Sequence, residues 1–259
     1  MRLWYILAMI SAFFTISITI VLPLLAFFYL LVKRRAYVVP FLVGVATFTI
    51  FQLLSRLPLI QGVLANYIWF KIFMQDIPLY LLFLSFTAAL FEEGGRYIMM
   101  HFLLKRNKPY QNALAFGVGH WGIEALLIVG APVLSVLIAG QADQVSWVAG
   151  LERLSTLPMH VCWSILVMRA LQERKPKLLL LAMFFHCATN YLTIISYLGA
   201  SVAVLEGILF VVGLGFAAYA VTQKRYFSEL LEENVPEAPD GTEQDLNLPE
   251  AEPSEGGDA

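Results

Sequence analysis

Two adjacent glutamates, Glu92 and Glu93, lie inside a long apolar run of the chain and are followed one helical turn later by Arg96. On insertion scales a charged side chain at the centre of a bilayer costs about 2.5–3.5 kcal/mol, so a membrane segment that carries three such groups needs a reason to do so. A carboxylate can take a proton from water as a general base. This stretch is therefore the first candidate for a catalytic centre.

Histidines and further polar residues occur in three other apolar runs of the chain. An imidazole close to a carboxylate can act as a general acid or base in the activation of water. An arginine or an amide can orient that carboxylate or stabilise the oxyanion that forms during hydrolysis. On this chemistry we expect a catalytic set made of Glu92, Glu93, Arg96, His120, Glu124, His160, His186 and Asn190.

Metal binding is the second chemistry open to these histidines. Three imidazoles can hold Zn²⁺ and leave a fourth position for a water molecule, whose pKa the ion lowers. If a metal is bound, we expect its ligands to be His120, His160 and His186. Without a metal, the same side chains polarise the carbonyl group. Both versions predict hydrolysis, and the choice between Zn²⁺ and no cofactor stays open at this point.

The composition predicts which elements position these groups. The chain has 259 residues, of which 59% are hydrophobic, and its mean hydropathy is +0.72. These values are far above those of soluble domains. Several apolar runs reach about 18 residues, the length at which a helix crosses a bilayer. We therefore expect an all-α, polytopic membrane bundle in contact with lipid and no nucleic-acid partner.

Seven membrane spans can be drawn along the chain, with Pro23 as a kink in the first. They are residues 3–32, 38–54, 78–104, 111–128, 147–171, 178–197 and 202–222. The wetter stretch 55–76 is expected to be a loop with an interfacial helix. After Pro132, the residues up to Gly140 either extend the fourth span or form an eighth element.

The distribution of charge predicts an orientation. Most of the 17 basic residues follow the odd-numbered spans, including Lys105, Arg106 and Lys108 after the third. Cytoplasmic loops are enriched in Lys and Arg, so the N-terminus is expected outside. Residues 1–225 form the expected bundle. Residues 226–259 are acidic and poor in large apolar residues, which predicts a disordered cytoplasmic tail.

Depth and helical facing suggest that the polar groups meet. At a rise of about 1.5 Å per residue, Glu92, His120, His160 and His186 all lie about 13–20 Å from the basic ends of their spans. Residues four apart share a helix face, and the sequence offers such pairs at Glu92 and Arg96, His120 and Glu124, and His186 and Asn190. Lipid cannot solvate these faces, so they should point into the bundle.

Glycines surround one of these histidines. Gly117, Gly119 and Gly122 flank His120 in the sequence FGVGHWG. Small residues in membrane helices let two backbones approach closely. They can equally leave room for a substrate strand or a water pocket. Both interpretations are open from the sequence.

Four short motifs resemble the YhfC family of intramembrane proteases and, more distantly, the superfamily of CAAX prenyl endopeptidases and bacteriocin-processing enzymes. The motifs are EEGGR (92–96), GHWGIEA (119–125), ERLSTLPMH (152–160) and HCATN (186–190). The resemblance covers most of residues 3–222 and not the tail. The spacing here is Glu-Glu-x-x-Arg, whereas the wider superfamily has Glu-Glu-x-x-x-Arg.

The resemblance implies roles for these residues. Glu92 would activate the attacking water with Glu93 beside it, and Arg96 would hold the acidic pair. His186 and Asn190 would stabilise the oxyanion or complete the site. Either His120 or His160 would match the middle histidine of the family pattern. The YhfC group is called a metalloprotease group, whereas the related superfamily is also described as glutamate-dependent without a catalytic metal.

The sequence therefore predicts an intramembrane endopeptidase in a bacterial cell membrane, acting on membrane proteins or peptides. A proton-coupled transporter or channel is the alternative from another class, because it would use similar groups strung along the membrane normal. Glu152, Arg153 and Glu206, expected near the outer side, favour that alternative. An inactive scaffold of the same fold is the third possibility.

Overall fold

The computed structural model describes residues 2–104 and 109–233, and within these two segments every regular element is a helix. Seven helices are long and apolar enough to cross a membrane. They are Trp4–Lys33, Arg35–Asn66, Ile77–Leu103, Pro109–Ile138, Trp147–Gln172, Pro176–Tyr197 and Val202–Glu229. The predicted all-α bundle with seven spans is confirmed. Lys105, Arg106 and Lys108 lie outside the described residues, and the orientation of the chain stays a prediction.

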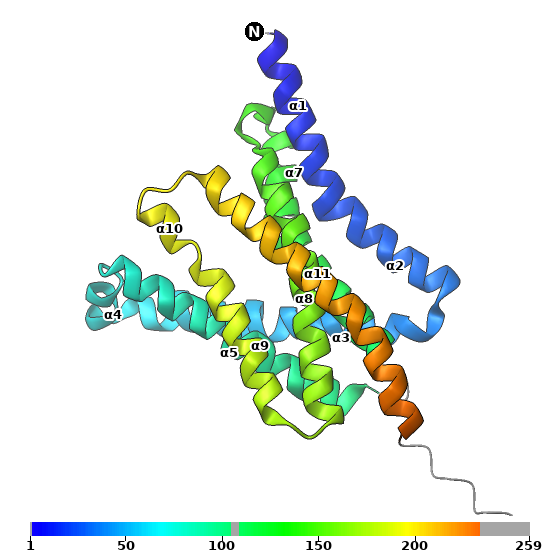
Figure 1. The fold of residues 1–259 in the computed structure, drawn as a ribbon. Helices are drawn as coiled ribbons and strands as arrows, with labels where there is room; N and C mark the ends of the chain where they lie inside the picture. The colour runs from blue at the N-terminus through cyan, green and yellow to red at the C-terminus, as the bar shows by residue number, and fades with distance from the viewer. Residues whose placement is uncertain (1, 105–108, 234–259) are drawn as a thin grey trace, which may run out of the picture.

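The first span bends through a π-helical segment. It comprises α1 (Arg2–Ile16), the π-helix η1 (Ser17–Val21) and α2 (Leu22–Lys33), which run down one side of the molecule in Figure 1. The wider turn of η1 directly precedes Pro23, whose ring removes a backbone hydrogen bond and crowds the preceding turn.

The second span is longer than the sequence suggested. After the 3₁₀ turn η2 (Arg35–Tyr37), the helix α3 (Val38–Thr47) continues without a loop through the remaining turns of the span. These turns are η3 (Phe48–Arg56), η4 (Pro58–Val63) and η5 (Leu64–Asn66). The expectation of a loop from residue 55 was therefore wrong for residues 55–66. Arg56 is buried inside the bundle, where it bonds to neighbouring polar groups, instead of marking a wet loop.

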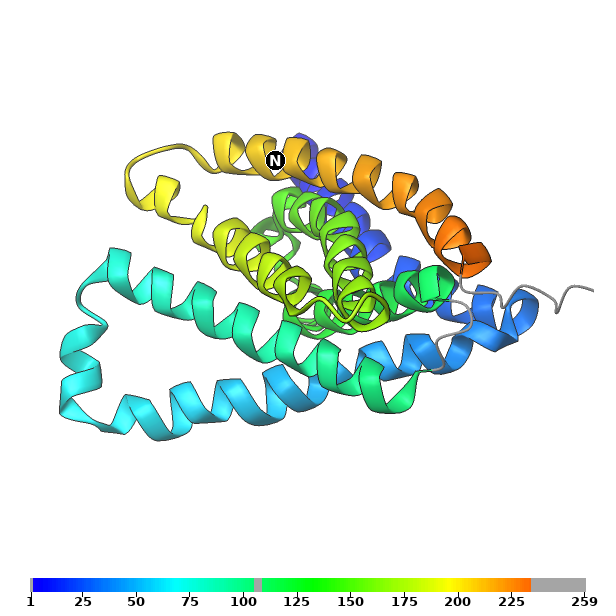
Figure 2. The ribbon, with the colours of Figure 1, turned by 60° about the horizontal axis from the view of Figure 1, so that its bottom comes forward.

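The third and fourth spans follow a short connecting helix, α4 (Ile68–Phe73), which joins the second span to the third in Figure 2. The helix α5 (Ile77–Leu103) starts where the Asp76 side chain accepts a hydrogen bond from the Leu79 amide at 3.2 Å. The fourth span joins α6 (Pro109–Glu124), the π-helix η6 (Ala125–Gly130) and α7 (Ala131–Ile138). Pro132 stands in the first turn of α7, where proline is tolerated. The residues after Pro132 thus extend this span.

The last three spans begin after a short 3₁₀ turn, η7 (Ala142–Gln144). They comprise α8 (Trp147–Gln172), then α9 (Pro176–Tyr191) with α10 (Ile194–Tyr197), and finally α11 (Val202–Glu233). The helix α11 continues eight residues past the expected end of the bundle at 225. Residues 234–259 lie outside the described residues, so the disordered tail stays a prediction.

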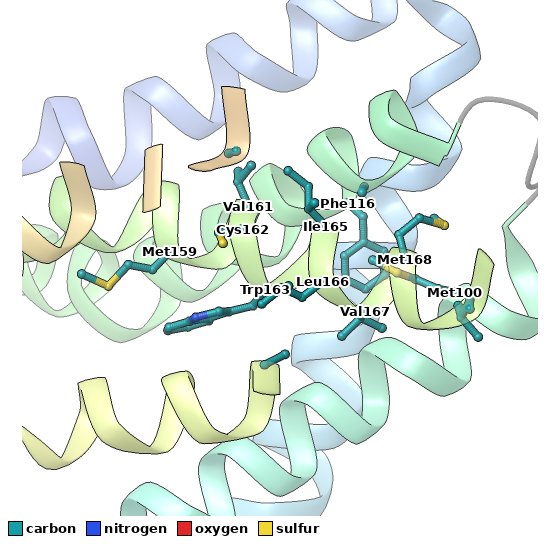
Figure 3. Close-up of a cluster of buried hydrophobic side chains, with 14 of the residues drawn as sticks. Met100, Phe116, Met159, Val161, Cys162, Trp163, Ile165, Leu166, Val167 and Met168 are labelled. Carbon is teal, nitrogen blue, oxygen red and sulfur yellow. The ribbon is translucent and has the colours of Figure 1, made fainter. Parts of the chain in front are cut away.

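The helix α8 is the central element. In its most apolar stretch 72% of residues are buried, against 17–33% for the other spans, because α5, α6, α9 and α11 all pack around it. Figure 3 shows the apolar side chains of α8, among them Trp163, Ile165 and Met168, gathered with Phe116 and Met100 of its neighbours. Many large apolar side chains of the outer helices are exposed, as lipid contact requires.

The glycines around His120 serve close packing. A Cβ atom on Gly119 would stand 2.1 Å from the backbone oxygen of Phe41, and one on Gly44 would stand 2.1 Å from that of Phe116. The helices α3 and α6 therefore touch backbone to backbone. A Cβ on Gly117 would likewise meet Val161 of α8 at 2.7 Å. Of the two interpretations of these glycines, the structure supports helix packing.

Candidate functional site: a carboxylate–histidine cluster above a membrane pocket

Four helices bring the predicted catalytic residues to one level. Helix α5 carries Glu92, Glu93 and Arg96, α6 carries His120 and Glu124, α8 carries His160, and α9 carries His186 and Asn190. Apart from Glu124 and Asn190, each of these residues is at most 3% exposed. Because lipid cannot satisfy them, these polar faces must satisfy one another or water in a pocket.

The first pair of the cluster joins α5 to α6. The Nε2 atom of His120 lies 2.9 Å from Oε2 of Glu92, at hydrogen-bond distance. The ring of His120 also packs against Phe48 and against the ring of His160, with centroids 5.4 Å apart in both contacts. The Nδ1 atom of His120 is buried and has no hydrogen-bond partner among the described residues.

The second pair joins α6 to α8. The Nε2 atom of His160 lies 3.1 Å from Oε2 of Glu124. The other carboxylate oxygen of Glu124 accepts a hydrogen bond from Arg153 at 2.7 Å, and Arg153 is in turn bonded to its neighbour Glu152. The Arg153 backbone oxygen accepts a bond from the Trp121 indole at 2.7 Å. Arg153 thus fixes the position of Glu124.

The third pair joins α5 to α9. The Nδ1 atom of His186 lies 2.8 Å from Oε1 of Glu93. The ring of His186 stacks on the indole of Trp163, with centroids 4.2 Å apart and planes 9° from parallel. These contacts fix the ring and leave Nε2 as the nitrogen available to a substrate.

Arg96 connects the three pairs. Its guanidinium lies 3.3 Å from Glu93 and 3.9 Å from Glu92, and it contacts both the backbone oxygen and the Nδ1 atom of His160, at 3.3 Å and 2.7 Å. Arginine only donates hydrogen bonds, so Nδ1 of His160 must be the acceptor. In a neutral His160 the proton is therefore on Nε2, which faces Glu124.

A pocket of about 330 Å³ adjoins the cluster. Glu92, Glu124, His160, His186 and Asn190 line it, whereas Glu93, Arg96 and His120 lie behind this lining. The pocket extends from the cluster toward the N-terminal ends of α5, α8 and α11, because its other lining residues on these helices lie closer to those ends. The further lining residues include Gln52, Arg56, Ser85, Glu152, Arg153, Thr156 and Leu205. Water and a peptide segment can meet the carboxylates here.

Several residues at the site were not part of the sequence-based set. Arg153 was assigned to the outer side of the membrane, and Arg56 to a loop, yet both line the pocket. Trp163 is buried and stacks on His186. The spacing of Arg153 and His160, one face of a single helix, was the one available signal for Arg153. His101, left out of the set, is exposed and packs on Tyr97 outside the cluster.

The donor chemistry tests whether a metal ion fits this site. One ligand atom from each of Glu92, His120, Glu124 and His160 lies within 4.8 Å of the others. Imidazole nitrogens and carboxylate oxygens are ligands that zinc prefers. Glu124 Oε2 faces Nε2 of His160 and has no second partner within the described part of the chain, so it can still serve as a ligand. The donors fit a divalent ion at Glu92, His120 and Glu124.

Two histidines depart from the metal set expected from the sequence. His186 is engaged with Glu93 and is not among the four close donors. His160 is among them, but a metal-bound imidazole usually donates its second N–H to an acceptor. The Nδ1 atom of His160 instead faces the donating Arg96. The expected ligand set of three histidines stays a prediction. The geometry favours a different set, in which the carboxylates of Glu92 and Glu124 join His120.

These features define a multi-pass integral membrane protein with a buried carboxylate–histidine centre. The family model described as "YhfC intramembrane metalloprotease" matches residues 18–149 and 141–211, and the chain belongs to this family. It is similar to "Uncharacterized membrane protein YhfC" of Bacillus subtilis (strain 168), with 30% identity over 188 residues, 61% of this chain and 73% of that protein. No solved structure gives a significant match.

Proposed function

We propose that this protein hydrolyses peptide bonds of membrane proteins or peptides within or close to the bilayer. The observation that carries the proposal is the meeting of Glu92, His120, Glu124 and His160 beside a pocket inside a seven-span bundle. The family description, intramembrane metalloprotease, supports the same reaction class. A water molecule in this pocket would be sheltered from lipid and close to two carboxylates.

In this proposal Glu92 is the general base. It lines the pocket and takes a proton from water, whose oxygen then attacks the carbonyl carbon of the substrate. The proton returns from Glu92 to the departing amine nitrogen when the C–N bond breaks. His120 holds the carboxylate of Glu92 from behind the pocket lining.

His186 and Asn190 are assigned to the oxyanion. The carboxylate of Glu93 would hold the ring of His186 so that its Nε2 points to the developing negative charge. Trp163 holds the ring by stacking. Asn190 lies one turn further along α9 and lines the same pocket.

A divalent ion is compatible with this site. In that version Glu92, His120 and Glu124 would hold the ion, with His160 at the edge of the donor group, and the ion would supply Lewis-acid activation of water. Glu92 would then be a ligand and not the general base. The metal content of purified wild-type protein and of the His120→Ala variant tests this part. Equal and near-zero zinc in both proteins would remove the metal version and leave the glutamate version.

The reaction class is tested by product analysis. Purified protein in liposomes is incubated with a model spanning peptide that contains a Gly-Ser pair, in water enriched in ¹⁸O. We expect a new C-terminal carboxylate that carries one ¹⁸O atom, identified by mass spectrometry. Intact peptide across a panel of such substrates would contradict the proposal.

One observation favours a proton-coupled transporter as a second candidate. The chain of polar contacts from His160 through Glu124, Arg153 and Glu152 runs toward the start of α8, and buried Glu206 adds a carboxylate on α11. Proton flux into liposomes loaded with a pH-sensitive dye distinguishes the two. A flux that Glu206→Gln abolishes would support transport, whereas an unchanged background flux supports the hydrolase.

A further inference from the structure

Arg56 differs from the other buried arginines of the described chain. Three arginines, Arg56, Arg96 and Arg153, are at most 7% exposed. Arg96 and Arg153 each lie within ion-pair distance of two glutamates. Arg56 makes no ion pair in the segments that the structure describes, although it stands within a membrane span at 6% exposure. A positive charge at this depth is costly unless something anionic meets it.

The hydrogen bonds of Arg56 involve only neutral groups. Its Nε donates to Thr87 Oγ1 at 3.0 Å, one terminal nitrogen to Gln52 Oε1 at 3.2 Å, and the other to the Leu84 backbone oxygen at 2.6 Å. A guanidinium has five N–H donors. One N–H on each terminal nitrogen therefore remains, and such N–H groups can donate to a carboxylate.

The position of Arg56 relates it to Glu92. Both residues line the pocket, and Arg56 is bonded to α5 at Leu84 and Thr87, eight and five residues before Glu92. With a rise of about 1.5 Å per residue, the guanidinium lies about 8–12 Å from Glu92 along the helix axis. An extended peptide covers that distance in about two to four residues.

The wall of the pocket carries charges of both signs. Glu92 and Glu124 line it beside the cluster, and Arg153 lines it while paired with Glu124 and Glu152, whereas Arg56 lines it without an ion pair among the described residues. An anionic group on a substrate is repelled by the carboxylates and attracted by Arg56. Binding of such a group would determine in which direction the substrate peptide lies in the pocket, and which of its peptide bonds lies beside Glu92.

We propose that Arg56 binds a carboxylate of the substrate about two to four residues from the hydrolysed bond, and so determines specificity. The inference rests on the proposed peptide hydrolysis. The carboxylate comes from an acidic side chain or from the free C-terminus of the peptide, since both offer the same two oxygens. Arg56 acts here as a binding residue and takes no part in proton transfer.

The test measures binding and cleavage separately. Full-length protein in nanodiscs is titrated with a fluorescent spanning peptide whose C-terminal part contains a Gly-Ser pair. Four versions combine Glu or Gln three residues after this pair with a free or an amidated C-terminus. We expect at least one of the two carboxylates to raise affinity about 10- to 100-fold in the wild type, and Arg56→Gln to remove that preference. The peptide that binds more tightly shows whether the carboxylate is the glutamate side chain or the free C-terminus.

Thr87→Val separates charge recognition from a merely structural role. This change removes one neutral bond of Arg56 and keeps its charge. We expect Thr87→Val to retain the preference for the anionic peptide. Arg56→Lys should retain only part of it, because lysine keeps the positive charge but lacks the planar guanidinium with its several N–H donors. Equal affinity for all four peptides, or a preference that survives in Arg56→Gln, would overturn the inference. If the protein prefers the anionic peptides through Arg56 but cleaves none of them, the hydrolase proposal is rejected and the binding role of Arg56 remains.

Discussion

Two polar clusters on the central helix α8 differ in how completely their charges are paired. The first is the pocket cluster around His160, and the second surrounds Arg169, nine residues later and about 14 Å along the axis. In the second cluster Arg169 donates to Glu173 at 2.7 Å and to Tyr219 and Gln223 at 3.0 Å, and its guanidinium lies over the ring of Tyr226. The remaining oxygen of Glu173 accepts from Lys175 at 2.8 Å.

The pocket cluster, in contrast, keeps polar atoms without partners. Within the described residues, one side-chain atom of each of three members is buried and makes no hydrogen bond: Glu93, Arg96 and His120. A pocket lies directly beside them and is lined by Glu92, Glu124 and His160. Unsatisfied buried groups are destabilising, so they persist where another requirement maintains them. We infer that the Arg169 cluster holds helices together and that the pocket cluster holds reacting groups.

Arg96 gives the largest expected effect on stability. Its removal leaves Glu92 and Glu93 buried without their shared cation, and breaking such a buried pair costs about 3–5 kcal/mol. We expect Arg96→Gln to lower the free energy of unfolding by that amount, measured by denaturant unfolding in detergent. Arg169→Gln should cost about 1 kcal/mol, because part of its surroundings reaches solvent. Equal losses in the two variants would erase the difference between the clusters.

Glu93 gives the next effect, on activity. Glu93→Gln removes the carboxylate that orients His186, and we expect hydrolysis to fall about 100-fold. The unfolding midpoint should fall as well, because Arg96 keeps only the more distant of its two carboxylates, so rates are compared between folded proteins. The measurement is the initial rate of peptide cleavage across pH. An unchanged rate would remove His186 from the reaction and leave it as a packing residue.

Gly119 tests the contact that positions His120. Gly119→Ala forces a Cβ against the Phe41 backbone, and overpacking of this kind costs about 1–3 kcal/mol. Gly215→Ala is the matched control, since a Cβ there meets nothing within 4 Å and alanine favours the helix. Thermal unfolding of both variants checks the prediction. Similar midpoints for the two would mean that α3 and α6 are not held in close contact.

Glu173 gives the smallest effect, and it depends on pH. Burial alone would raise the pKa of Glu173, but hydrogen bonds from Arg169 and Lys175 outweigh it and lower the pKa to about 2. The stabilisation is therefore present above the ordinary pKa of 4.5 and is lost as the pH falls toward 2. We expect wild type to unfold at a slightly higher temperature than Glu173→Gln at pH 7, and the gap to close by pH 2–3. A gap that widens in acid would contradict this assignment.

The sequence predicted the spans well and one boundary badly. Long apolar runs leave few alternatives to a membrane helix, so all seven spans appear. The prediction for residues 55–66 failed because polar residues such as Arg56 and Gln61 are compatible both with a wet loop and with a membrane helix. What decides between the two is the pair of acceptors that Thr87 and Leu84 provide from another helix. Local polarity carries no information about that partner.

The sequence predicted which residues meet in the cluster better than it predicted which of them contact each other. Depth along each span placed Glu92, His120, His160 and His186 together because helical rise is regular, and the structure brings them together. Facing predicted that His120 and Glu124 share one side of their helix and point into the bundle, but not which residues they contact. Their partners Glu92 and His160 lie on other helices, and the rotation of each helix depends on packing such as the glycine contact of α3 with α6. Sequence spacing alone does not determine that rotation.

The same substitution in the two clusters tests the central claim most directly. Cleavage of the model spanning peptide is measured for wild type, Glu92→Gln and Glu173→Gln, with unfolding midpoints recorded for all three proteins. If the pocket cluster is the hydrolytic centre, Glu92→Gln lowers kcat/KM about 10²–10⁴-fold while remaining folded. Glu173→Gln should stay within about twofold of wild type, because that cluster only joins helices. A folded Glu92→Gln variant that cleaves as fast as Glu173→Gln would contradict the account.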